Sequence, residues 1–331
     1  MLTLSQENRQ PLIRTPIIPR NKADPTQSSR QVSRMVKDIR NRYYQIKLAL
    51  RQLFDQRLTG RESEQNSQKG FAFHGKTIYQ VNAGTYIYDM SASQLADLLQ
   101  IMQTILDDHL LDGGSNNLWA LDYVAAEYDR GTHAAFTNLS VQSPIYASQT
   151  TLSALLSSPS YQNQVAAAYV STYSDWKGVS DRARADLANV IADSIGRGIN
   201  PRETAQIISR RLDVSQASAE NIAQTEQVGA LREAQWLETD WSRDRLGLNT
   251  ALLHLSALKP TTRDNHAFWH GKTRTTEEVR EWYARDGNRY RCYCSQIPVI
   301  LNDKGEIVNT GLVERLSKER QEWKPLEKKS A

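Results

Sequence analysis

The stretch "VSRMVKDIRNRYYQIKLALRQL", residues 32–53, carries an uninterrupted helical pattern of apolar side chains. Its apolar residues recur every three or four positions, which is the spacing of one face of an α-helix. They are Val32, Met35, Ile39, Tyr43, Ile46, Leu50 and Leu53. The pattern predicts a long basic amphipathic helix over residues 28–60, suited to an extended packing element or to a helix lying along a larger assembly.

Residues 1–27, which precede this helix, include four prolines and scattered isoleucine and leucine. Proline has no backbone N–H to donate and clashes with the preceding helical turn, so this segment is not a helix. We expect an extended Pro-rich arm that becomes ordered only against a partner. We expect the arm and the long helix to dock on another protein, because the apolar face needs a surface that covers it.

Positive charge is concentrated at the start of the chain. The formal net charge of all 331 residues is +4, whereas residues 1–60 alone contain 12 Lys and Arg against 4 Asp and Glu. This imbalance indicates that the segment meets a negative partner, such as nucleic acid or an acidic protein surface. A basic helix that is simply solvated would show the same charge.

The composition disfavours membrane and secreted proteins. No apolar run approaches the roughly 18 residues of a membrane span, and the first residues lack the pattern of a secretory signal. The chain has two cysteines, which are too few for a disulfide framework, so a reducing cytosol is the expected compartment.

The middle of the chain, residues 61–245, predicts a mainly helical body with a β-hairpin near residues 76–90. That stretch, "KTIYQVNAGTYIYDM", alternates around Asn82 to Gly84. Elsewhere in the body, helix starts are expected at serine or asparagine caps, and consecutive capped helices predict an antiparallel helical unit. The caps are Ser91 or Ser93, Ser180, Asn200 with Pro201 behind it, and Ser215.

The composition changes after Leu246. Two stretches, "LNTALLHLSALKP" and "RYRCYCSQIPVIL", read as strands with a turn or short helix between them. Residues 246–310 therefore predict a small α+β module, and residues 311–331 predict a charged helical tail. The expected fold is mainly α, with an elongated helical N-terminal and middle region and this small α+β C-terminal module.

Both cysteines of the chain, Cys292 and Cys294, belong to this module. Side chains two residues apart on a strand point to the same face, so the two thiols are expected side by side. Two thiolates make half of a zinc site, and His266 with His270, four residues apart, could supply the other half. The sequence therefore predicts a possible zinc site.

Other interpretations of the same residues stay open. The two cysteines could be small buried thiols, with His266 hydrogen-bonded in place. A cysteine and His266 could also form a nucleophile–base pair, although no oxyanion-site signature accompanies them. A disulfide between residues so close in a strand would be strained. Glu226 is expected to be a packing or salt-bridge residue, and no catalytic residue is predicted.

The order of several motifs resembles the phage Mu F-like family of head-morphogenesis, minor capsid proteins. "NIAQTEQVGALREAQ" is followed by "TTRDNH", then a glycine, then a C-x-C pair. The likeness covers about residues 180–300. The positions that match the family motif are Ala223, Thr225, Glu226, Thr262, Arg263, His266, Gly271, Cys292 and Cys294.

The sequence departs from the family pattern in two places, where Gln224 and Tyr293 replace arginines. Neither replacement removes a possible metal ligand. His270 has no counterpart in the family pattern, so the resemblance implies His266 and the two cysteines as the better ligand candidates.

The resemblance implies a structural virion protein rather than an enzyme. Such a bacteriophage protein lies inside the head near the portal, and in the host cytoplasm during assembly. It acts in procapsid assembly and in genome packaging or delivery. The expected partners are the portal protein, a scaffolding or major capsid protein, and phage DNA through the basic N-terminal segment, with no membrane. The alternative is a zinc-dependent DNA-processing enzyme, a metal-dependent nuclease acting on genome ends.

Overall fold

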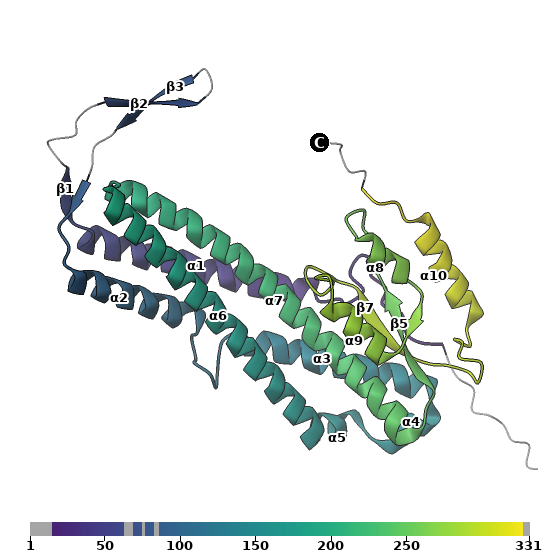
Figure 1. Cartoon of the computed structure of the whole chain (residues 1–331). Helices are drawn as coiled ribbons and strands as arrows, with labels where there is room; N and C mark the ends of the chain where they lie inside the picture. The colour runs from purple at the N-terminus through teal and green to yellow at the C-terminus, as the bar shows by residue number, and fades with distance from the viewer. Residues whose placement is uncertain (1–14, 63–68, 75–76, 83–85, 327–331) are drawn as a thin grey trace, which may run out of the picture. The chain divides into compact units, whose positions relative to one another are not determined.

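The computed structural model describes residues 15–62, 69–74, 77–82 and 86–326, and these residues are mainly helical (Figure 1). The helices are α1 Ser29–Arg57, α2 Ala92–Leu110, α3 Leu121–Gln142, α4 Pro144–Gln149, α5 Leu152–Leu156, α6 Pro159–Arg197, α7 Pro201–Leu246, α8 Asp264–Trp269, α9 Thr276–Ala284 and α10 Thr310–Glu322. The strands are β1 Gly60–Glu62, β2 Lys69–His74, β3 Thr77–Asn82, β4 Tyr86–Tyr88, β5 Thr250–Leu255, β6 Thr273–Arg274 and β7 Ser295–Ile300. The expected fold class, mainly α with a small α+β part, is confirmed.

The chain forms two compact units. The C-terminal unit comprises Met1–Arg34, Asp122–Tyr169 and Ala223–Ala331, and the helical unit comprises Met35–Leu121 and Val170–Ile222. Helices α1, α6 and α7 contribute residues to both units. None of the described helices has the length and hydropathy that a membrane span requires.

The apolar stripe of α1 forms as predicted, and the chain itself covers it. Each of its seven residues is at most 8 % exposed. In the helical unit, Tyr43 and Ser215 of α7 share a hydrogen bond of 2.7 Å between their hydroxyls. Arg40 also pairs with Glu220 of α7 at 2.9 Å. The expectation that this apolar face needs another protein is therefore wrong, because helices of the same chain bury it.

The predicted helix caps are correct in part. Ser91 caps α2 with a reciprocal capping box, and Asn200 accepts from the N–H of Arg202 at 2.9 Å where α7 begins. Ser180 and Ser215, however, lie inside α6 and α7. The Ser180 hydroxyl donates to Asp107 of α2 at 2.6 Å. A serine hydroxyl that bonds a neighbouring helix does not cap its own, so these two helices are longer than predicted.

The strands around residues 60–88 form, but with different partners from those predicted. β3 pairs antiparallel with β2, which precedes it, and His74 lies opposite Thr77. β4 pairs with β1, which follows α1. The predicted hairpin turn lies outside the described residues. An alternating pattern identifies residues that form strands without identifying their partner, and this is why the pairing prediction was wrong.

The arm is extended as expected, but its described part, residues 15–27, lies against its own chain. The backbone N–H and carbonyl of Ile17 both bond the side-chain amide of Asn138, each at 3.0 Å. Arg130 donates to the carbonyl of Thr26 at 2.8 Å. All of these contacts are within the C-terminal unit. The expectation that the arm orders only against a partner is wrong for these residues.

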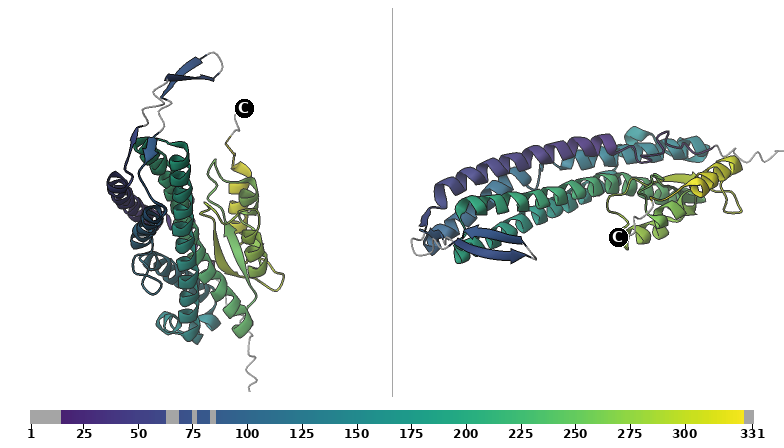
Figure 2. Two further views of the ribbon diagram at one scale, coloured as in Figure 1. Left: turned by 60° about the vertical axis from the view of Figure 1, so that its left-hand side comes forward. Right: turned by 90° about the horizontal axis from the view of Figure 1, so that it is seen from above.

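The predicted α+β module is present as a three-stranded antiparallel sheet in the order β6-β5-β7. Its green strands lie beside the yellow helix α10 in the left-hand view of Figure 2. On one face, Leu253 of β5 belongs to a core cluster with Leu316 of α10. On the other face, Leu252 packs in a cluster with Trp236 of α7 and both cysteines. Alternate residues of β5 thus face opposite sides, as the strand period requires. The predicted tail helix is α10, which Asn309 caps.

Candidate metal centre

The two cysteines lie just before a strand rather than within one, because β7 begins at Ser295. Arg291 has a φ of 51°, so the backbone turns through the left-handed region immediately before Cys292. The N–H of Cys294 bonds the Cys292 sulfur at 3.3 Å. The predicted strand over the cysteines is therefore wrong: this turn and the local hydrogen bond replace the sheet ladder there.

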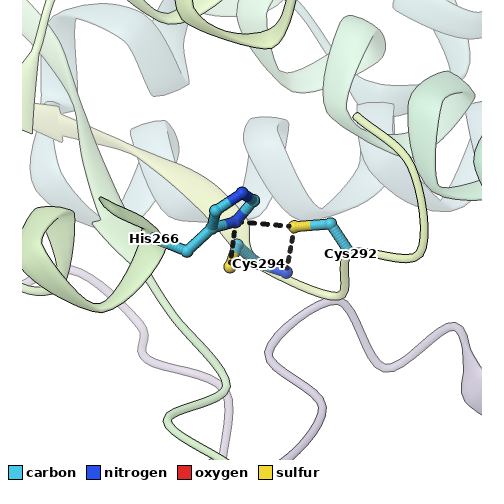
Figure 3. A group of neighbouring side chains, drawn as sticks. All are labelled: His266, Cys292 and Cys294. Carbon is cyan, nitrogen blue, oxygen red and sulfur yellow. Dashed lines mark hydrogen bonds between the residues drawn. The ribbon is translucent and has the colours of Figure 1, made fainter. Parts of the chain in front are cut away.

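His266, Cys292 and Cys294 come together in the C-terminal unit (Figure 3). His266 Nδ1 lies 3.3 Å from Cys292 Sγ and 3.5 Å from Cys294 Sγ. The three ligand atoms lie within 4.8 Å of one another. In tetrahedral zinc sites the metal–ligand bonds are about 2.0–2.3 Å, which separates neighbouring ligand atoms by about 3.5–3.8 Å. The observed spacing fits such a site after small shifts.

The tautomer of His266 is set by Asn288. His266 Nε2 lies 3.2 Å from Asn288 Oδ1, which also accepts from the side-chain amide of Asn265 at 2.8 Å. The Asn288 amide nitrogen donates to the carbonyl of Trp282 at 2.9 Å, so its oxygen faces His266. The proton of His266 therefore belongs on Nε2, and the Nδ1 lone pair faces the two sulfurs. A partner that orients a histidine in this way is typical of metal sites.

Sequence reasoning missed Arg232 of α7, which holds the cysteine segment. Its guanidinium donates to the carbonyl of Cys294 at 2.7 and 2.9 Å, and to the carbonyl and sulfur of Cys292 at 2.9 and 3.2 Å. It is 2 % exposed and lies 4.3 Å from the centre of the Tyr283 ring. One signal exists in the sequence: Arg232 stands four residues from the apolar Val228 and Trp236, so it falls on a buried helix face.

The two thiols differ in acidity because of these neighbours. Burial alone would raise the pKa of Cys292, but its hydrogen bond with Cys294 and the charge of Arg232 hold that pKa well below its ordinary value. The hydrogen bond with Cys292 and burial raise the pKa of Cys294 well above its ordinary value. Cys292 is therefore the more acidic of the two thiols, and its sulfur lies beside the guanidinium of Arg232.

Two further histidines lie nearby but do not join the cluster. His270 Nδ1 accepts from the N–H of Ser256 at 3.0 Å, and its Nε2 lies 3.4 Å from a carboxylate oxygen of Glu319. His254 Nδ1 lies 3.0 Å from the side-chain amide of Gln296, and burial lowers the pKa of His254 to about 3. The structure therefore places His270 away from the cysteines, with its ring committed elsewhere.

Arg263 and Glu226, from the family motif, hold the loop that leads to the cysteines. Arg263 donates to the carbonyls of Gly287, Asn288 and Tyr290 at 2.9 to 3.0 Å. Glu226 forms an ion pair with Arg289 at 3.2 Å, so it is a salt-bridge residue in the structure. Residues far from the cysteines in sequence thus fix the course of one loop.

The remaining motif positions have packing or backbone roles. Gly271 has a φ of 75°, and a Cβ there would lie 2.7 Å from the Cβ of Leu316, so a larger residue does not fit. Thr225 is buried in α7. The N–H of Thr262 donates to the carbonyl of Lys259 at 2.9 Å, in the turn before α8.

Residues 185–297 match the family model described as Phage Mu protein F like protein. The matched region contains the three clustered side chains together with Arg232 and Arg263. No curated protein and no solved structure shows a significant match. The match indicates a protein of the bacteriophage head, which would place it in the virion. Over these residues, about a third of the chain, the protein is similar to the phage Mu F-like head-morphogenesis proteins, as the resemblance implied.

Proposed function

We propose that this protein is a minor head protein that lies inside the capsid, attached to the portal. It acts in procapsid assembly and in genome packaging or delivery, after synthesis in the host cytoplasm. The observation that carries the proposal is the family match over residues 185–297, which includes every side chain of the cluster. A scaffolding or major capsid protein would be a second assembly partner.

Portal attachment is tested by comparing procapsids assembled with and without the portal protein. We expect mass spectrometry to find this chain only in particles that contain the portal. Equal incorporation without a portal would overturn the attachment. Counting DNA-filled heads, and measuring DNA delivery by virions that lack the chain, then separates a role in packaging from one in delivery.

We propose that His266, Cys292 and Cys294 bind zinc. The donor set suits that ion, because thiolates and an imidazole nitrogen are its preferred ligands. The neighbour of His266 also fits, since Asn288 bonds its Nε2 and so directs the Nδ1 lone pair at both sulfurs. A bound zinc would cross-link α8 to the segment before β7. Such a cross-link stabilises the fold and involves no substrate.

We propose that this site is structural and that the protein is not an enzyme. The three ligand side chains are at most 5 % exposed. Among the described residues, no carboxylate joins the cluster to serve as a general base. A nuclease assay with zinc-loaded protein and DNA carrying genome ends tests this. Cleavage that His266→Ala abolishes would instead favour the zinc-dependent DNA-processing enzyme.

We propose that α1 contacts phage DNA through a subset of its cations. Arg30, Arg34 and Lys37 are exposed and have no carboxylate partner among the described residues. Four other cations of α1 are already paired within the helical unit: Arg40 with Glu220, Arg42 with Asp112, Lys47 with Asp213, and Arg51 with Asp55. Only unpaired cations release counterions fully from DNA. The number of Lys and Arg residues in the sequence therefore overestimates the number of cations that can bind DNA.

A further inference from the structure

The segment Cys292–Cys294 has no sheet ladder to hold it. Its regular neighbour β7 begins one residue later, at Ser295. Four hydrogen bonds from Arg232 reach it instead, three to carbonyl oxygens and one to the Cys292 sulfur. These bonds come from α7, within the part of that 46-residue helix that belongs to the C-terminal unit.

We propose that Arg232 is the positioning residue of the metal centre. It fixes both cysteines before metal binds, so that zinc binds to a preformed site on an already folded protein. This inference rests on the proposed zinc site and adds how that site is assembled. Small zinc domains commonly fold only when metal is present, because they lack a core of their own.

The packing around the site supports this order of events. The cysteines belong to an apolar cluster with Trp236, Val279 and Tyr283. A second cluster, on the other face of the sheet, joins β5 and β7 to α10. Two apolar layers stabilise the fold around the sheet without a metal, and Arg232 then supplies the polar contacts of the cysteine segment.

The chemistry of arginine suits this role in both states of the site. In the metal-free protein its guanidinium donates to the Cys292 sulfur at 3.2 Å as well as to the carbonyls. When a divalent metal takes that sulfur, the three bonds to carbonyl oxygens remain, so the loop keeps its shape. Lysine cannot replace this function, because an ammonium group lacks the planar fork that reaches two carbonyls at fixed angles.

The test is the affinity of the full chain for zinc and cobalt, measured by competition with a chromophoric chelator. We expect Arg232→Lys to weaken binding by about 10–100-fold, as is typical when a residue that supports a ligand is lost. Arg280→Lys is the matched control, because Arg280 lies in the same unit but pairs with Asp240 and Glu233. It should bind as the wild type does. Equal affinity for Arg232→Lys and wild type would overturn the proposal.

Hydrogen–deuterium exchange of the metal-free wild type provides a measurement that does not depend on a variant folding. We expect the amides of Asn288, Tyr290 and Cys294 to be protected already without metal, and to change little when zinc is added. If these amides exchange freely until zinc binds, the metal orders the loop and the proposal is wrong. If the wild type binds neither zinc nor cobalt, the proposed zinc site itself fails, and the inference fails with it.

Discussion

The α1 stripe and the cysteine segment of the C-terminal unit are stabilised in opposite ways. The stripe consists of seven buried side chains along a 29-residue helix. Each one contributes its own share of apolar burial. The cysteine segment instead depends on one buried arginine with four hydrogen bonds and on one asparagine that orients a histidine. Stability is distributed in the first region and concentrated in the second.

This difference teaches where substitutions do damage. In α1 the effect of a change follows the apolar area that it removes, so neighbouring positions behave alike. In the cysteine segment the effect follows the number of polar groups left without partners, so adjacent residues can differ widely. Four expected results, ordered by their effect on stability, can break or sharpen this comparison.

The largest loss is expected in α1. Ile39→Ala removes a fully buried side chain and should lower the free energy of unfolding by about 2–5 kcal/mol, because it leaves a cavity. Thermal or urea unfolding measures the change. Tyr44→Ala is the control on the same helix, since Tyr44 is 59 % exposed, and should stay within about 0.5 kcal/mol. A small loss at Ile39 would contradict distributed apolar burial.

Zinc should stabilise the protein by about 2.7 kcal/mol when free zinc is 100-fold above its dissociation constant. Elemental analysis gives the metal content, and thermal unfolding with and without a chelator gives the gain. His266→Ala, Cys292→Ser and Cys294→Ser should each abolish that gain. His270→Ala should keep it, because His270 bonds Ser256 and lies away from the cysteines. Loss of the gain in His270→Ala would make it a fourth ligand.

Two buried or paired glutamates should give opposite dependences on pH. Burial raises the pKa of Glu238, whose carboxylate accepts from Tyr146. Its contribution to stability is therefore present below its unfolded pKa and is lost as pH rises through the raised value. A hydrogen bond from Arg40 lowers the pKa of Glu220, so its contribution is lost as pH falls. Unfolding across pH 3–8 should show Glu238→Gln gaining relative stability at high pH and Glu220→Gln losing it.

DNA binding should change with almost no change in stability. The triple variant of Arg30, Arg34 and Lys37 to Gln should reduce the slope of log affinity against log salt by about 3, because each phosphate contact contributes about 0.9. The matched control changes Arg40, Arg42 and Lys47 to Gln and should keep most of that slope. Filter retention of duplex DNA at several salt concentrations measures both. An equal loss of slope in both triple variants would mean that the total charge of α1 determines DNA binding, rather than its unpaired cations.

The sequence predicted those features that depend on local patterns. The period of the α1 stripe and the cap at Asn200 need only neighbouring residues, and both are confirmed. The partner of β3 and the interior positions of Ser180 and Ser215 depend on distant segments, which a local pattern does not contain. The burial of the stripe by its own chain was missed for the same reason.

Of the residues that form the candidate site, the sequence predicted only the metal ligands. The three side chains that cluster are those that the motif order implied, His266, Cys292 and Cys294. The residues that support the ligands were missed. Arg232 and Asn288 act through hydrogen bonds to carbonyl groups and to a histidine ring, and such bonds produce no characteristic spacing in the sequence. The strand expected over the cysteines failed because Arg291 turns the backbone just before them.

The arm, residues 15–27, contacts α10 and the residue that caps it, in the same C-terminal unit. Thr15 accepts from Asn309, and Lys22 pairs with Glu319 of α10 at 2.7 Å. During translation the helical unit has all its residues once position 222 has been made, whereas the arm must wait for α10. The helical unit can therefore begin to fold during synthesis, before the C-terminal unit, which joins distant segments of the chain, can close.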